Sequence, residues 1–134
     1  MGSVRNFFRV LFVLWAGSLW SLAAWVAWVL FSAQPDRQLA GSLAAHLFGI
    51  ETYLGLTVAL IALLLPGRGR YPWVYFAAAL LAVNEWLLKR LMNEAHAHGA
   101  AHGLSFGAWH GVSAVLYVTA CLAVVLFVWK QDLR

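Results

Sequence analysis

Four long apolar stretches run along the chain, and short polar segments separate them. A helix needs roughly 20 mostly apolar residues to cross the hydrocarbon core of a bilayer, and each stretch is about that long. Prolines, glycines and charged residues between the stretches mark where helices stop. The pattern predicts helices at about residues 10–31, 41–65, 71–90 and 106–129. We therefore expect one all-α integral membrane domain over residues 1–134, an antiparallel four-transmembrane-helix bundle.

The composition agrees with a chain that is covered by lipid. The 134 residues are 63% hydrophobic and 10% charged, and they include eight Trp. A soluble domain of this length has no core large enough to hide so much apolar surface. The net charge of +4 comes from basic residues at the segment ends, so it indicates membrane topology and not nucleic-acid binding. The lipid bilayer is the expected partner.

The distribution of Lys and Arg predicts the orientation. Three regions carry two basic residues each: Arg5 and Arg9, Arg68 and Arg70, and Lys130 and Arg134. The connection after the first stretch carries one, and the connection after the third carries two. The positive-inside rule then places both termini in the cytoplasm. We expect a multi-pass protein of an inner (plasma) membrane, with the connection between the third and fourth helices outside.

Ionisable residues interrupt three of the apolar stretches. His46 and Glu51 lie in the second, Glu85 in the third and His110 in the fourth. At a rise of about 1.5 Å per residue, these side chains come to lie roughly 6 to 15 Å below the outer surface. A charged group in hydrocarbon costs about 2.5 to 3.5 kcal/mol, so such groups are expected to face the bundle interior. The sequence therefore predicts a His/Glu cluster in the outer half of the bundle.

Metal binding is the leading functional prediction, because imidazole and carboxylate groups are ligands for Zn, Cu(II) and Fe. The predicted ligands are His46, Glu51, Glu85 and His110. A histidine-rich loop above them would supply the ion through His96, His98 and His102. The protein would then be a non-enzymatic binding or transport-type membrane protein.

Two other chemistries use the same residues. His46 and His110 lie at similar depth on two helices, as the axial ligands of a haem b would. Glu51, Glu85 and a histidine could instead relay protons, because Glu and His are the usual intramembrane proton carriers.

A structural reading explains the polar residues without a ligand. Glu85 lies four residues before Lys89, the spacing of a helical ion pair. Glu51 would be neutral and hydrogen-bonded inside the bundle, Asn84 would join two helices, and the loop histidines would be solvated. The chain would then be a structural or accessory subunit of a larger membrane complex, packed through its Trp-rich first helix.

Small and aromatic residues predict where helices pack. Gly103, Gly107 and Gly111 recur at every fourth residue, a pattern that lets another helix approach closely. This pattern makes a homodimer plausible and favours an inward-facing His110. Trp20 and Trp25 fall deep in the first stretch, where we expect packing or a ligand pocket to hold them.

Nothing in the chain predicts nucleophilic catalysis. Ser105, Ser113 and Cys121 lack the neighbours of a catalytic triad, and the sequence contains no Gly-rich phosphate loop. Cys121 is the single cysteine, which excludes an intramolecular disulfide and a Cys-based metal motif.

Three segments resemble a known family: residues 14–20 (LWAGSLW), residues 35–41 (PDRQLAG) and residues 109–113 (WHGVS) with Leu116 and Tyr117. They are similar to the small membrane proteins grouped as domain of unknown function 4149, related to the transmembrane-protein-205-like family. The resemblance implies a four-helix membrane protein in which His110, Gly111 and Ser113 match the most recognisable motif. It implies no established activity.

Overall fold

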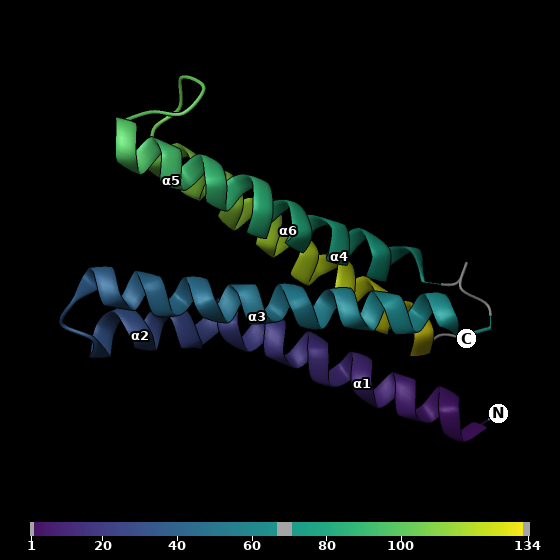
Figure 1. The fold of residues 1–134 in the computed structure, drawn as a ribbon. Coiled ribbons are helices and arrows are strands. Elements are labelled where there is room, and N and C mark those ends of the chain that lie inside the picture. The colour runs from purple at the N-terminus through teal and green to yellow at the C-terminus, as the bar shows by residue number, and fades with distance from the viewer. Residues whose placement is uncertain (1, 67–70, 133–134) are drawn as a thin grey trace.

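The computed structural model describes residues 2–66 and 71–132, and these residues are almost entirely helical. Figure 1 shows the order of the elements. They are α1 (Gly2–Ser21), the π-helical turn η1 (Leu22–Val26), α2 (Ala27–Ala33), α3 (Arg37–Leu64), α4 (Pro72–Val83), the π-helical turn η3 (Asn84–Leu88), α5 (Lys89–His98) and α6 (Phe106–Asp132).

The π-helical turns join their flanking helices into longer rods. At the end of η1 the Ala27 N–H bonds to the Leu22 carbonyl, and at the end of η3 the Lys89 N–H bonds to the Asn84 carbonyl. Each bond spans five residues, so the backbone continues as a helix with one extra residue in a turn. The described chain thus forms four rods: residues 2–33, 37–64, 72–98 and 106–132. Consecutive rods run in opposite directions, and both termini lie at the same end (Figure 1).

Three of these rods are long and apolar enough to cross a membrane: Gly2–Ala33, Arg37–Leu64 and Phe106–Lys130. The prediction of an all-helical membrane protein is therefore confirmed. The rod at residues 72–98 is of similar length, but Asn84, Glu85 and Lys89 make its middle more polar.

The helix ends follow from capping chemistry. The Asp36 carboxylate accepts hydrogen bonds from the backbone N–H groups of Gln38 (2.9 Å) and Leu39 (3.1 Å), which starts α3. Pro72 occupies the first turn of α4, where its missing N–H costs nothing. Gly99 adopts a left-handed conformation (φ 83°) directly after α5, as glycines at helix ends do.

The third rod is longer than the sequence pattern predicted. The third helix was predicted to end at about residue 90, before a histidine-rich loop, yet α5 continues to His98. Leu91 and Ala95 are buried against Ala101 and Trp109, which holds this polar stretch in a helix. The indole N–H of Trp109 donates to the Ala101 carbonyl at 2.9 Å and closes the connection to α6. Packing on one face therefore outweighs the polar character of the other.

The core lies between the rods at the end that holds the termini. Four side chains one turn apart on α1 form its centre: Phe8, Phe12, Trp15 and Leu19. They pack against Val74 and Leu81 of α4 and Val124 of α6, with other residues of these helices. At the opposite end α2 packs on α3 and α5 packs on α6, and the two pairs diverge (Figure 1). No residue of α2 is buried.

Candidate functional site

Each of the four rods carries polar side chains near its middle. We call this set the polar layer. It consists of Ser18 on α1, Glu51 and Thr52 on α3, Asn84 and Glu85 on η3, and Ser113 and Tyr117 on α6. If the rods cross a bilayer, the layer lies at mid-depth and not in its outer half. The layer would then lie deeper than the outer-half position predicted from the sequence, because the third rod extends beyond Arg90 to His98.

Glu51 is the more deeply buried of the two carboxyl groups in the layer, with 7% of its surface exposed. Its carboxyl Oε2 lies 3.0 Å from the hydroxyl oxygen of Ser18. The same hydroxyl oxygen lies 2.8 Å from the backbone carbonyl of Trp15. The ion pair found among the described residues joins Glu85 and Lys89, so Glu51 has no cationic partner there. The expectation that Glu51 is hydrogen-bonded inside the bundle is confirmed.

Two further hydroxyls tie the helices together around Glu51. The phenol of Tyr117 donates to the Leu19 carbonyl at 2.8 Å, which joins α6 to α1. The hydroxyl of Thr52 lies 3.1 Å from the Phe48 carbonyl of its own helix and 3.4 Å from the Leu81 carbonyl of α4. Both residues are buried, and a buried hydroxyl without a partner would be costly. Glu51 therefore lies in a tightly connected part of the bundle.

Asn84 joins the third rod to α6. Its side-chain amide donates to the Ser113 carbonyl at 3.1 Å, and its side-chain oxygen accepts a hydrogen bond from the Ser113 hydroxyl. The prediction that Asn84 links two helices is confirmed. Because Ser113 belongs to the Trp-His-Gly-x-Ser segment, the link also gives that segment a structural role.

Glu85 faces a different neighbour from Asn84. Its carboxylate accepts a hydrogen bond from Lys89 at 2.8 Å, so the predicted helical ion pair is confirmed. The carboxylate also lies against Gly49 of α3, where an added Cβ would come within 3.3 Å of its Oε1 atom. Gly49 therefore allows the ion pair to sit beside the α3 backbone.

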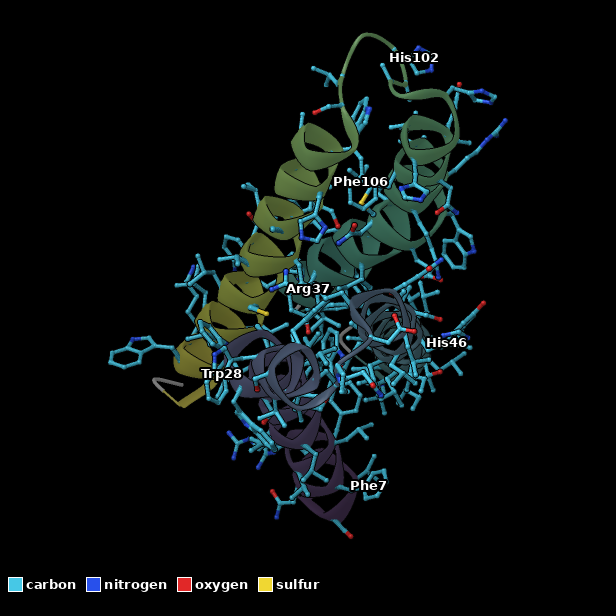
Figure 2. All side chains as sticks on the ribbon, turned by 90° about the vertical axis from the view of Figure 1, so that its left-hand side faces the viewer. Phe7, Trp28, Arg37, His46, His102 and Phe106 are labelled. Carbon is cyan, nitrogen blue, oxygen red and sulfur yellow. The ribbon has the colours of Figure 1, made fainter. Side chains whose placement is uncertain are left out.

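The histidines do not join the polar layer. His46 and His110 are exposed, as are His96, His98 and His102. The Nδ1 atom of His46 lies 2.8 Å from the Ser42 carbonyl of its own helix, and the His110 ring stacks on Phe106 at 6.0 Å. Figure 2 shows His46 on the flank of α3 and His102 at the far tip of the other helix pair. The prediction that His46 and His110 face the bundle interior is therefore wrong.

The described residues contain no group of three or more His, Cys, Asp or Glu placed to hold a metal ion. The seven predicted ligands are spread over α3, η3, α5, α6 and the connection before α6. His96 and His98 belong to helix α5, so only His102 lies in the expected loop. The exposed positions of His46 and His110 also give no support to a pair of haem ligands from one protomer. The carboxyl and hydroxyl groups of the polar layer are therefore better candidates for a functional site than the histidine side chains.

Glycine and tryptophan positions correct two further expectations. An added Cβ at Gly103 or Gly111 would meet nothing within 4 Å, and one at Gly107 would meet the Ser105 hydroxyl oxygen at 3.9 Å, so no other described helix packs on that face. Among the described glycines, Gly55 of α3 is the one at which helices approach most closely.

Trp20 and Trp25 have 38% and 57% of their surfaces exposed, and they point out of the bundle instead of packing inside it or lining a pocket. Indole rings tolerate this position because lipid surrounds them.

Sequence reasoning missed Ser18, Thr52 and Tyr117 as members of the layer. Serine and threonine are common in apolar helices, where their hydroxyls usually bond to their own backbone, so they give a weak signal. A tyrosine in the middle of an apolar stretch is a stronger one, because its hydroxyl needs a partner away from the membrane surface.

Replacing Asn84 with alanine is expected to lower the free energy of unfolding by about 1 to 2 kcal/mol, because both of its bonds to Ser113 are lost. Replacing Ser113 with alanine removes only the hydroxyl bond and is expected to cost less. In a double-mutant cycle measured by unfolding in detergent, the two losses should be less than additive. Full additivity would contradict a direct Asn84–Ser113 link.

The fold and the polar layer define an all-helical membrane protein with an ionisable group near the centre of its bundle. The model of a family described as a domain of unknown function, DUF4149, matches residues 10–101, more than half of the chain. The chain belongs to this family, as the resemblance predicted. The match includes Glu51, Asn84 and Glu85 and ends before residues 109–113. A search of curated proteins found no match, and neither did a search of solved structures.

Proposed function

We propose that this protein is a four-span inner-membrane protein that binds and passes a proton through Glu51 in the middle of the membrane. One observation carries the proposal: the Ser18 hydroxyl lies within hydrogen-bond distance of both the Trp15 carbonyl and the Glu51 carboxyl. Intramembrane carboxyl groups that face a bundle interior commonly belong to proton or ion pathways.

The Ser18 hydroxyl lies between two oxygen atoms, those of the Trp15 carbonyl and the Glu51 carboxyl. A serine hydroxyl has one hydrogen and can donate to only one oxygen at a time. The Trp15 carbonyl can only accept. Both contacts are satisfied together when Ser18 donates to Trp15 and Glu51 donates to Ser18. This arrangement requires a protonated Glu51 carboxyl.

Release of the proton would change the same hydrogen bonds. An ionised Glu51 can only accept, so the Ser18 hydroxyl would turn from Trp15 to the carboxylate. Among the described residues, the groups around Glu51 are Ser18 of α1 and the Tyr117 and Cys121 side chains of α6, which lie close enough to interact with it electrostatically. Glu85 and Lys89 of the third rod neutralise each other beside Gly49. Proton binding at Glu51 of α3 thus changes the hydrogen bond of the Ser18 hydroxyl, which belongs to α1.

A fourth span at residues 72–98 is part of the proposal. The polar side chains near its middle have protein partners in place of water, because Asn84 bonds to Ser113 and Glu85 pairs with Lys89. With four spans, the basic residues at the ends favour an orientation with both termini in the cytoplasm.

Proton flux into liposomes tests this function. The purified protein would be reconstituted with a pH-sensitive dye inside the vesicles, and a pH gradient would be applied. We expect Glu51→Gln to reduce the flux to that of protein-free vesicles, because glutamine cannot exchange the proton. Glu85→Gln is the matched control, since it removes a second mid-bundle carboxyl that is already ion-paired, and it should retain the wild-type flux. Equal flux in wild type and Glu51→Gln would contradict the proposal.

Assembly with a partner is the second candidate function. It is favoured by the exposed face of α2, where Trp28 has 71% of its surface exposed, and by Gly111 of α6, where an added Cβ would meet nothing within 4 Å. A stable partner or a homodimer in mild detergent would support this function, and a monodisperse monomer would count against it. The predicted transition-metal site can be tested directly by elemental analysis of protein that is purified without a histidine tag.

A further inference from the structure

At the end of the molecule that holds both termini, a groove runs between α1 and α6. Its cavity volume is about 80 Å³. Four aromatic rings form part of its lining: Phe8, Phe12, Tyr71 and Phe127. These rings contact one another, with centroid distances of 4.4 Å for Phe12–Phe127 and 5.4 Å for Phe8–Tyr71. The apolar wall of the groove is therefore preformed.

Two arginines line the same groove. Arg5 and Arg9 are four residues apart on α1, so they lie on one face of the helix, one turn apart. None of the described residues that line the groove is acidic. A guanidinium group donates several parallel hydrogen bonds and matches the oxygens of a phosphate group. The groove thus combines an anion-binding rim with an apolar interior.

We propose that this groove binds an anionic phospholipid, with the headgroup phosphate held by Arg5 and Arg9 and part of an acyl chain against the aromatic wall. The size of the groove argues for a lipid. Sites for free small molecules usually have several hundred Å³, whereas 80 Å³ accommodates only part of a molecule. A lipid can place that part in the groove while the rest remains in the bilayer. Basic pockets between membrane helices are known to select anionic headgroups.

Lys130 offers a matched control for charge. It lies at the same end of the molecule, on α6, but its ammonium group sits 5.0 Å from the ring centre of Trp73. It is not among the residues that line the groove. If anionic lipid bound through general attraction to basic residues, its binding would depend on Lys130 as much as on either arginine. If it bound in the groove, its binding would not depend on Lys130.

Native mass spectrometry of the full chain in detergent tests the proposal, with phosphatidylglycerol, phosphatidylcholine and inorganic phosphate as separate probes. The wild type should retain phosphatidylglycerol in preference to phosphatidylcholine and should not retain inorganic phosphate. Arg5→Gln/Arg9→Gln should weaken phosphatidylglycerol binding by about twenty-five-fold, because each arginine beside an anionic headgroup contributes about a factor of five. Lys130→Gln should bind like the wild type.

A second double variant, Arg5→Lys/Arg9→Lys, separates charge from geometry. It keeps both charges but loses the paired N–H donors, so we expect binding between that of the wild type and that of the glutamine variant. Equal retention of the two phospholipids by the wild type would overturn the proposal. So would unchanged binding in Arg5→Gln/Arg9→Gln, an equal loss in Lys130→Gln, or capture of inorganic phosphate in place of lipid.

Discussion

The substitution Gly55→Leu is expected to lower the free energy of unfolding by about 3 kcal/mol or more, the upper range for overpacked cores. A Cβ added at Gly55 would lie 2.9 Å from Cζ2 of Trp15 and 3.1 Å from Cδ1 of Leu81. Both neighbours are almost fully buried, at 3% and 1% exposure, so neither can move aside without shifting its helix. The larger side chain must separate α3 from α1 and α4.

Gly111→Leu is the matched control for this substitution. Gly111 is also helical, but an added Cβ there meets nothing within 4 Å. Its free energy of unfolding should stay within about 1 kcal/mol of the wild type, because a leucine at that position extends into lipid. Unfolding in mixed micelles of mild detergent and dodecyl sulfate would measure both variants. Similar losses at the two positions would contradict the close approach at Gly55.

The substitution Glu51→Lys is expected to lower the free energy of unfolding by about 3 kcal/mol, the cost of placing a charge at the centre of a membrane helix. Its ammonium group would replace a buried carboxyl and would find the Ser18 hydroxyl but no carboxylate partner there. Glutamine at the same position should cost less than about 1 kcal/mol. Its amide can donate to Ser18 as a protonated carboxyl does.

The comparison between lysine and glutamine discriminates between two states of Glu51. If Glu51 were ionised, glutamine would remove a charge that the surrounding groups stabilise, and its cost would approach that of lysine. If the region around residue 51 were solvated, lysine would be tolerated. Unfolding in the same mixed micelles measures both variants. A small cost for lysine, or a large one for glutamine, would contradict a neutral buried carboxyl.

The sequence predicted the helices well because their length and hydropathy are set by the bilayer. It failed at the end of the third helix, where the polar segment 91–98 is helical because Leu91 and Ala95 pack on Trp109. The first helix also begins earlier than residue 10, at Gly2, because Phe8 packs in the core. In both cases a few packed side chains extend a helix into a polar segment.

The candidate site was harder to predict because these helices are apolar on every side. In a soluble helix the polar face shows which residues point outward, but lipid removes that contrast. The sequence therefore could not show that His46 faces away from the bundle while Glu51, five residues later, faces into it. The two π-helical turns add a second difficulty, because each inserts a residue and changes which side chains face a neighbour.

The structural reading of the polar residues was the more accurate one. It predicted the Glu85–Lys89 ion pair, the helix link through Asn84 and the hydrogen-bonded Glu51, and all three are found. These contacts follow from local rules of helix spacing and of hydrogen bonding in apolar surroundings. A metal site depends instead on the mutual orientation of several helices, which a single sequence does not supply.

Infrared difference spectroscopy on the purified protein in liposomes measures the protonation of Glu51 most directly. A protonated carboxyl has a C=O stretch that an ionised carboxylate lacks. At neutral pH we expect this band in the wild type and in Glu85→Gln, and we expect Glu51→Gln to lose it. A wild-type spectrum without the band, or a band that survives in Glu51→Gln, would contradict a proton-binding site at Glu51.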